Sequence, residues 1–454
     1  MGRMGPADDP DAQPEPVAAD GPRAPTPGLV GVIALPGIAL WKRQPVVAAF
    51  LMIAGVMAPA FAILLVFQNR DDLVGLFTRT NVLRGMALVC LAAITSRLIA
   101  IWLTADTIRS PAAQRRMRQL GSAAVVALAI PTALLVARME QVRSVVAMVF
   151  QTSTQAGVIT APAEVDPLAG QFHTVLLMGS DEGNDRISLR TDTMILALVH
   201  ESGRTALVSV PRNLARLRFP PGTVMAKSYP NGFEDKEGGL ANSIYVTVEN
   251  SEELTNAYDK DGLQPGIVAL MEGLSFSLGI TIDDYAMLNS CGFVKLVDAI
   301  GGITINIDKE LPMPEKLRCS NYRLTPTIGP GVTYMDGTKA LGYVRSRYAD
   351  SDYQRMERQR ILLQTIADEI GLDDLLLRFG ELADAVKDNV RTTMTVEEAR
   401  TLLATLQNTA AFESVGLSPP LIQPSRPDYV EVKALMQQIR QALSADTPLN
   451  LPTS

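Results

Sequence analysis

The chain has 454 residues, of which 47% are hydrophobic and only 5% aromatic, and its formal net charge at pH 7 is −7. This length is sufficient for one large domain with additional segments. The N-terminal tail carries more acidic residues than arginines, which excludes a basic arm of the kind that binds nucleic acid.

The first 150 residues predict a disordered tail followed by a membrane anchor. Up to about Leu29 the sequence is rich in Pro, Ala, Asp and Gly and has no apolar period, so residues 1–44 are assigned to the tail. Residues 45–150 contain three apolar segments, and a helix needs about 20 such residues to cross a bilayer. These segments lie near Val46–Phe67, Gly85–Leu103 and Ala123–Val136, the last being short unless it extends toward Phe150.

Basic residues set the expected orientation of this anchor. Lys42 and Arg43 precede the first apolar segment. The connection between the second and third segments holds Arg109, Arg115, Arg116 and Arg118. By the positive-inside rule the tail and this connection are cytoplasmic. We therefore predict a multi-pass protein of the cell membrane whose C-terminal part is extracellular.

The remaining chain predicts a linker and one globular domain. Residues 151–170 are assigned to the linker and residues 171–454 to the domain. Short apolar runs predict strands near Thr174–Met178, Met194–Val199, Ala206–Val210, Tyr285–Leu288 and Ile303–Ile307. Helices are predicted near Pro265–Leu278 and Gly292–Ile300. This alternation favours an α/β domain with a central mixed sheet that has helices on both faces.

A basic stretch from Gly342 to Arg360 is the first candidate for a functional site. It is predicted to form a strand over Gly342–Tyr348, an acidic turn, and a helix opened by Ser351 and Gln354 at capping-box spacing. Spacing along the strand and the helix directs five polar side chains toward one region: Arg345, Arg347, Arg355, Arg358 and Gln359. Guanidinium groups beside a helix N-terminus suit a pyrophosphate ligand, although a solvated charge run has the same composition.

A second candidate lies between two apolar strands in the segment Leu176–Val199. Its polar part contains Asp181, Arg190 and Asp192. Carboxylates at strand ends hold Mg²⁺ together with phosphate oxygens of a substrate. For any one of these acids taken singly, a turn residue or an exposed ion pair is the better interpretation.

The motifs in these stretches resemble the LytR-CpsA-Psr family of cell-wall glycopolymer ligases. The chain carries Gly-Ser-Asp at 179–181, Arg-x-Asp-Thr at 190–193, Ser-x-Pro-Arg at 209–212, a Gly-Phe-x-x-Leu-Val-Asp-Ala-x-Gly-Gly run at 292–302, and the arginine-rich stretch at 345–359. Together they are ordered over roughly 180 residues, which makes the resemblance far more specific than a lone short motif.

This resemblance implies an enzyme that transfers a glycan 1-phosphate from a polyprenyl-pyrophosphate carrier in the membrane lipid to peptidoglycan. Asp181 and Asp192 match metal-holding acids, and the expected ion is Mg²⁺, with Mn²⁺ as an alternative. Substrate binding is assigned to Arg190, Arg212, Arg355, Arg358 and Gln359. Catalysis is assigned to Asp192, Asp352, Arg345 and Arg347.

The base that activates the incoming sugar hydroxyl remains open between two acids. Asp192 and Asp352 both match the role, but Asp192 is also explained as a metal ligand and Asp352 as a helix cap. Two other functions compete with transfer. One is hydrolysis of the same lipid pyrophosphate by water, and the other is non-catalytic regulation by binding an anionic lipid.

Several positions allow more than one interpretation. Leu176, Met194, Leu288 and Phe293 would suit a groove for the lipid tail, although the hydrophobic core is the favoured interpretation for each one. On the extracellular side Cys291 and Cys319 are able to pair if the fold brings them together. Neither of the two histidines has metal-ligand spacing, so no zinc site is expected.

Two positions depart from the commonest family pattern. Asn213 follows Arg212 where the family frequently has Asp, and Leu240-Ala241-Asn242 stands where many members have Lys-Ile-Asn. The anchor also has three apolar segments where many members have one.

Overall fold

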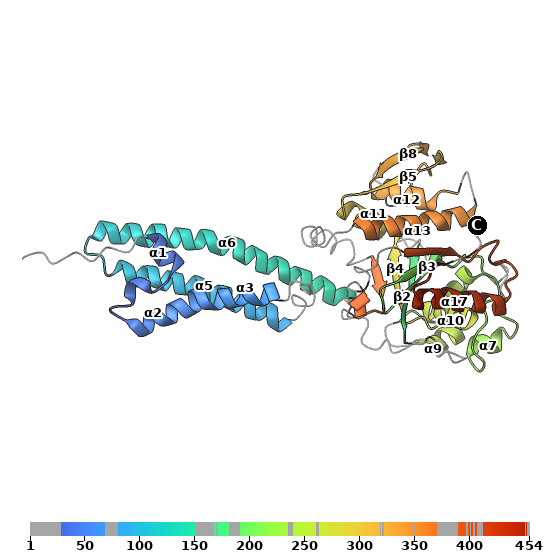
Figure 1. Ribbon diagram of the computed structural model, residues 1–454, viewed down its shortest axis with the longest axis horizontal. Coiled ribbons are helices and arrows are strands. Elements are labelled where there is room, and N and C mark those ends of the chain that lie inside the picture. The colour runs from blue at the N-terminus through green and yellow to red at the C-terminus, as the bar shows by residue number, and fades with distance from the viewer. Residues whose placement is uncertain are drawn as a thin grey trace, which may run out of the picture. The chain divides into compact units, whose positions relative to one another are not determined.

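The computed structural model divides into two compact units, a helical one that ends at Val136 and an α/β one that follows (Figure 1). It describes residues 29–68, 80–150, 168, 170–180, 191–234, 239–259, 263–317, 319, 322–347, 351–369, 389–395, 398–399, 401–402, 405, 412–449 and 451. The two units are taken in turn.

The helical unit is built from apolar helices. They are α1 (Leu29–Ala34), α2 (Pro45–Met52), a π-helical turn (Ile53–Met57), α3 (Ala58–Gln68), α5 (Thr80–Ala105) and α6 (Pro111–Phe150). Three stretches are long and apolar enough to cross a membrane: Pro45–Leu64, Arg84–Ala105 and Pro111–Leu134. The third predicted segment thus belongs to a helix that starts well before Ala123 and extends to Phe150.

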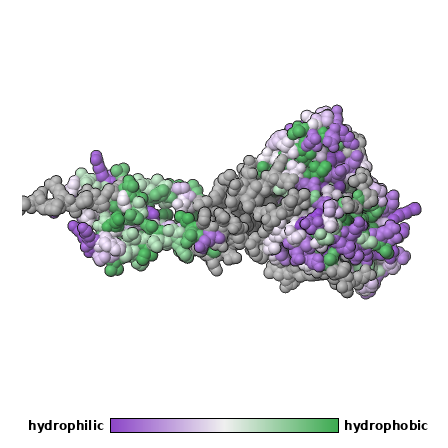
Figure 2. All heavy atoms as spheres, viewed as in Figure 1, coloured by the Kyte–Doolittle hydropathy of each residue, from purple (hydrophilic) through white to green (hydrophobic). Residues whose placement is uncertain are grey.

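Hydrophobic side chains are prominent on the face of these helices that Figure 2 shows. Phe50, Phe61, Leu88 and Leu134 are all exposed. A water-soluble bundle would bury such residues along one stripe of each helix. The exposed apolar side chains agree with helices that are long and apolar enough to cross a membrane.

A six-stranded mixed sheet forms the centre of the α/β unit, as predicted (Figure 1). Its order is β10 (Phe412–Gly416), β3 (Thr205–Ser209), β2 (Thr191–His200), β1 (Phe172–Ser180), β4 (Asp284–Asn289) and β9 (Val390–Thr392). The pairs β1–β4 and β3–β10 are parallel and the others are antiparallel. Two small sheets pair β5 (Ile303–Ile307) with β8 (Gly331–Met335) and β6 (Leu311–Pro312) with β7 (Thr327–Ile328).

Side chains that alternate along the central strands pack against helices of this unit. The helices are α7 (Val224–Ser228), α8 (Ile244–Glu249), α9 (Glu252–Tyr258), α10 (Pro265–Leu278), α11 (Ser290–Ala299), α12 (Gly337–Arg345), α13 (Asp352–Glu369) and α17 (Tyr429–Ser444). Leu176 and Leu196 belong to a core cluster with residues of α10 and α17. Val175 and Ile195, one position earlier on the same strands, instead pack in a cluster with Leu363 of α13. The period of two along each strand therefore distributes its side chains between two layers.

Most predicted elements are confirmed at their predicted positions. Helix α10 occupies its predicted range. Helix α11 and the strands β1 to β4 each differ from their own predicted ranges by a few residues at the ends. The predicted strand at Ile303–Ile307 exists, but it pairs with β8 in a separate sheet. Both capping-box bonds at the start of α13 form, because the Ser351 and Gln354 N–H groups each donate to the other side chain at 3.3 Å.

The predicted strand at Gly342–Tyr348 is wrong over its described part. Residues Gly337–Arg345 form α12, which starts after Asp336, whose carboxylate accepts the N–H of Lys339 at 2.9 Å. Buried Ala340, Leu341 and Val344 have helical rather than alternating spacing. Arg345 and Arg347 consequently do not share the face of a strand.

Cys291 and Cys319 form a disulfide, with their Cα atoms 5.1 Å apart. It joins the first turn of α11 to the segment between β6 and β7. This resolves the pairing that the sequence left open.

A partly buried ion pair at the start of β1 predicts a pH-dependent stability. His173 Nε2 lies 3.1 Å from Asp284 Oδ2, and this contact raises the pKa of His173, opposed by burial and helped by the charges of Asp283 and Glu398. A raised pKa means that the stabilisation is full below the unfolded pKa, about 6.5, and is lost as pH rises through the folded pKa. We expect the melting temperature of the full chain in detergent to fall as the pH rises above about 6.5, and to fall less in His173→Gln. Equal slopes in the two proteins would contradict this role.

Candidate active site

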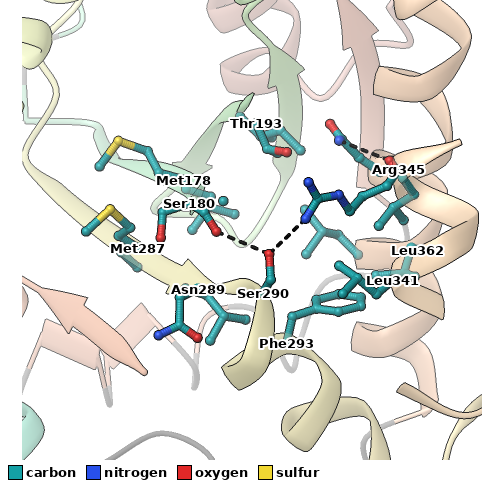
Figure 3. A pocket seen from close by; sticks show the side chains of 18 of the residues that line it. Met178, Ser180, Thr193, Met287, Asn289, Ser290, Phe293, Leu341, Arg345 and Leu362 are labelled. Atoms are coloured by element: carbon teal, nitrogen blue, oxygen red, sulfur yellow. Dashed lines mark hydrogen bonds between the residues drawn. The ribbon is translucent and has the colours of Figure 1, made fainter. Parts of the chain in front are cut away.

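A cavity of about 360 Å³ lies between the sheet and helices α11, α12 and α13 (Figure 3). Most of its lining is apolar, including Leu177, Met178, Ile195, Met287, Leu288, Phe293, Leu341, Val344, Leu362 and Leu363. Its polar lining comprises Ser180, Thr193, Asn289, Ser290, Arg345, Arg347, Arg355 and Gln359. One cavity therefore combines a hydrocarbon surface with a group of guanidinium ions.

Parallel pairing of β1 with β4 positions one wall of the cavity. The register places Ser180 opposite Asn289, so the carboxyl ends of both strands lie side by side. Helix α11 starts at this point, and the Asn289 side chain caps it by accepting the Gly292 N–H at 2.8 Å. Polar side chains from a strand end and a helix start are thereby brought to the same edge.

Three arginines from different segments surround the carboxylate of Asp352. Arg355 Nη2 lies 3.0 Å from Asp352 Oδ1, Arg212 Nε 3.4 Å from Oδ2, and Arg347 Nη1 3.9 Å from Oδ1. Arg355 is almost fully buried, whereas half of the Arg347 side chain is exposed. One carboxylate among three guanidinium groups leaves an excess of positive charge, which favours an anionic ligand.

Arg345 and Gln359 extend this polar group along the cavity. Arg345 is the last residue of α12, and its Nη1 donates to Ser290 Oγ at 3.2 Å (Figure 3). Gln359 on α13 lines the cavity and its Nε2 donates to the Val344 carbonyl at 3.4 Å. The structure therefore brings Arg212, Arg345, Arg347, Asp352, Arg355 and Gln359 into one region.

Arg358 occupies a different position from its predicted neighbours. Its side chain is buried, its Nε donates to the Tyr343 carbonyl at 3.1 Å, and its Nη2 donates to the Ser346 carbonyl. These bonds tie α13 to the C-terminal end of α12, where unpaired carbonyls need donors. Arg358 thus holds the helix end that carries Arg345.

The predicted metal acids lie partly beyond what the structure describes. Asp181 and Arg190 are outside the described residues, and for Asp192 only the backbone in β2 is described. The β1–β2 register pairs Gly179 with Thr193 and Ser180 with Thr191, with an irregularity between the pairs. This places Asp192 opposite the end of β1, next to which Asp181 follows in sequence. Among the described residues no cluster of three or more His, Cys, Asp or Glu suits a metal ion.

The sequence interpretation missed the polar residues Asn289 and Ser290, and the structure separates its four apolar candidates. Asn289 and Ser290 line the cavity, and their position just before the Gly292 motif is the only sequence signal for them. Leu288 and Phe293 line the cavity as well, whereas Leu176 and Met194 belong to the hydrophobic core.

The chain belongs to the LytR_cpsA_psr family, whose sequence model matches residues 143–420. This confirms the resemblance inferred from the motifs.

Curated relatives are similar to half or more of the chain. Biofilm regulatory protein A of Streptococcus mutans is 27% identical over 233 residues, which are 50% of this chain and 51% of that protein. The polyisoprenyl-teichoic acid–peptidoglycan teichoic acid transferase TagU of Enterococcus faecalis is 27% identical over 287 residues, 60% of this chain and 80% of that protein. The chain thus spans about half the length of the first of these relatives. Among solved structures, protein gbs0355 from Streptococcus agalactiae is 22% identical, with a TM-score of 0.45, over 63% of this chain and 92% of that one.

The position of Arg358 predicts a structural effect that is separable from binding. In Arg358→Lys the charge is retained but the fork that reaches two carbonyls is lost. We expect a loss of about 2 kcal/mol in the free energy of unfolding, because buried carbonyls lose a charged donor. The matched control is Arg347→Lys, a half-exposed site, for which we expect a change below about 0.5 kcal/mol. Thermal unfolding of the full chain in detergent measures both changes. Equal losses would show that the bonds from Arg358 to the end of α12 do not stabilise the fold.

Proposed function

We propose that this protein transfers a glycan 1-phosphate from a polyprenyl-pyrophosphate carrier to a hydroxyl of peptidoglycan. The observation that carries the proposal is the cavity in which apolar side chains adjoin Arg345, Arg347 and Arg355. An apolar lining suits a prenyl chain, and guanidinium groups suit the diphosphate attached to it. The printed name of the Enterococcus faecalis relative, a teichoic acid transferase that acts on peptidoglycan, supports the same assignment.

Transfer of this kind requires charge neutralisation more than covalent catalysis. The acceptor oxygen forms a bond to the phosphorus next to the glycan while the bond from that phosphorus to the bridging oxygen breaks. The lipid phosphate then leaves with the electron pair, and the hydroxyl proton passes to a base. Arg345, Arg347 and Arg355 are proposed to stabilise the charge that develops on the phosphate oxygens.

The contacts of Asp352 favour a positioning role over that of the base. Its carboxylate lies within 4 Å of Arg212, Arg347 and Arg355. A carboxylate whose oxygens face three guanidinium groups is well placed to orient them. Asp192 is then the remaining candidate for the base.

We propose a divalent cation as the partner of two acids near the ends of β1 and β2. Asp181 and Asp192 are proposed to hold Mg²⁺, or Mn²⁺ in its place, because carboxylate oxygens suit hard cations. The β1–β2 register supports this, since it pairs Ser180, which precedes Asp181 in sequence, with Thr191, which precedes Asp192. When bound, the ion would neutralise charge on the phosphate oxygens. Arg190, next to Asp192 in the same motif, is proposed to contact the substrate.

The proposed substrate requires a domain at the outer membrane surface. We propose that Pro45–Leu64, Arg84–Ala105 and Pro111–Leu134 cross the membrane and that the α/β unit is extracellular. The disulfide between Cys291 and Cys319 supports this side, since disulfides persist in oxidising compartments.

Removal of the Arg345 side chain tests the transfer activity. We expect Arg345→Ala to lower turnover at least about 100-fold, because a preorganised charge that faces the developing phosphate charge is lost. The matched control is Arg323→Ala, an exposed arginine paired with Glu315, which should keep normal turnover. The measurement is product analysis with labelled lipid-linked glycan and peptidoglycan. Free phosphorylated glycan without ligated product would favour hydrolysis, and lipid binding without any turnover would favour a regulator.

Labelling of single cysteines tests the orientation. Lys309 and Arg115 are both exposed, the former in the α/β unit and the latter at the start of α6. We expect a membrane-impermeant maleimide to label Lys309→Cys in intact cells and Arg115→Cys only after permeabilisation. The parent chain, whose free thiol is Cys90, serves as the background. The reverse pattern would place the α/β unit in the cytoplasm.

A further inference from the structure

The hydroxyl of Ser290 lies between two polar groups of the cavity (Figure 3). Its Oγ donates to the carbonyl oxygen of Ser180 at 3.3 Å and accepts from Arg345 Nη1 at 3.2 Å. A serine hydroxyl has a single proton, so the bond to Ser180 leaves its lone pairs to the guanidinium. The arrangement therefore suits a donor at the position of Arg345.

The backbone that carries this hydroxyl is fixed by its neighbours on both sides. Asn289 caps the helix start, and Cys291 is held by the disulfide to Cys319. Gly292 permits a close approach to Asn389, the residue before β9, because a Cβ at position 292 would lie 2.3 Å from the Cβ of Asn389. Because the backbone around it is fixed, the Ser290 side chain has little freedom of its own. It can therefore hold the Arg345 guanidinium in a defined orientation.

Ser290 also connects two parts of the site that are distant in sequence. Ser180 is the last residue of β1 and directly precedes Asp181, whereas Arg345 ends α12. We propose that Ser290 is a positioning residue that directs the Arg345 guanidinium toward the diphosphate. It acts through Arg345 and does not touch the reacting atoms. This inference rests on the proposed function, whose diphosphate site it completes.

Binding of inorganic pyrophosphate with Mg²⁺ tests this role without requiring transfer. The full chain in detergent is titrated by calorimetry as wild type, Ser290→Ala and Ser290→Thr. We expect Ser290→Ala to bind about ten-fold more weakly, because Arg345 loses a charged hydrogen bond and regains rotamer freedom. Ser290→Thr keeps the hydroxyl and should return to within about three-fold of wild type. In transfer assays the Ser290→Ala variant should have a lower kcat than wild type, because Arg345 is no longer held in place. Ser290→Thr should recover the kcat.

Ser277→Ala is the matched control for loss of a buried serine. Ser277 on α10 is buried, accepts the Arg218 N–H at 2.7 Å and donates to the Arg218 carbonyl at 3.2 Å. It belongs to a different layer from the cavity, so its loss should lower the melting temperature and leave pyrophosphate affinity unchanged. If Ser290→Ala does not fold, Ser290→Gly removes the same hydroxyl and takes its place.

The outcomes separate this inference from the proposed function. Equal pyrophosphate affinity in wild type and Ser290→Ala, or no recovery in Ser290→Thr, would overturn the role of Ser290 even if transfer is observed. A wild-type chain that binds pyrophosphate, shows the expected loss in Ser290→Ala and transfers no glycan would retain the role and overturn the transfer. A wild-type chain that binds no pyrophosphate would overturn both.

Discussion

Three guanidinium groups beside an apolar cavity repel one another, and the structure brings them together with one carboxylate. Asp352 lies at the start of α13 and contacts Arg212, Arg347 and Arg355, which come from three separate segments. At an effective dielectric constant of about 20, like charges roughly 5 Å apart repel by about 3 kcal/mol, so convergence without the carboxylate would be costly. The proposed diphosphate would meet a site that is already assembled.

Buried arginines of α13 hold this assembly in place from behind. Arg358 donates to two carbonyls at the end of α12, and Arg360 donates to Ser414 Oγ at 2.6 Å and Ser209 Oγ at 2.8 Å. Burial lowers the pKa of Arg360 from its ordinary value. Helix α13 therefore presents Arg355 and Gln359 to the cavity. Its Arg358 bonds to the end of α12, and its Arg360 bonds to β3 and β10.

Elements with one strong local signal were predictable, and those with two competing periods were not. Apolar runs ended by polar residues located the strands, and Pro265 followed by apolar residues located α10. Around Gly342–Arg347, the alternation of Arg345 and Arg347 suggested a strand. Buried Leu341 and Val344, which are three residues apart, instead fit the helix that forms. A segment so short fits both periods, and the start signal at Asp336 lies several residues upstream. Contacts made through folding, such as those of Arg358 with α12 and Ser290 with β1, have no counterpart in local spacing.

The two halves of the cavity would serve different parts of the proposed reaction. Each buried methylene of a prenyl chain contributes about 0.8 kcal/mol, so the apolar lining would dominate the affinity for the carrier. That contribution is nearly the same for the lipid pyrophosphate and for the lipid phosphate that remains after transfer, because the chain does not change. Only the cationic side of the cavity distinguishes the two, since the second phosphate is present in the substrate alone. The prenyl chain is likewise unchanged in the transition state, and binding energy that is equal for the substrate and the transition state does not accelerate the reaction. The arginines and the groups that orient them must therefore provide the catalysis, while the apolar side chains retain the carrier at the site.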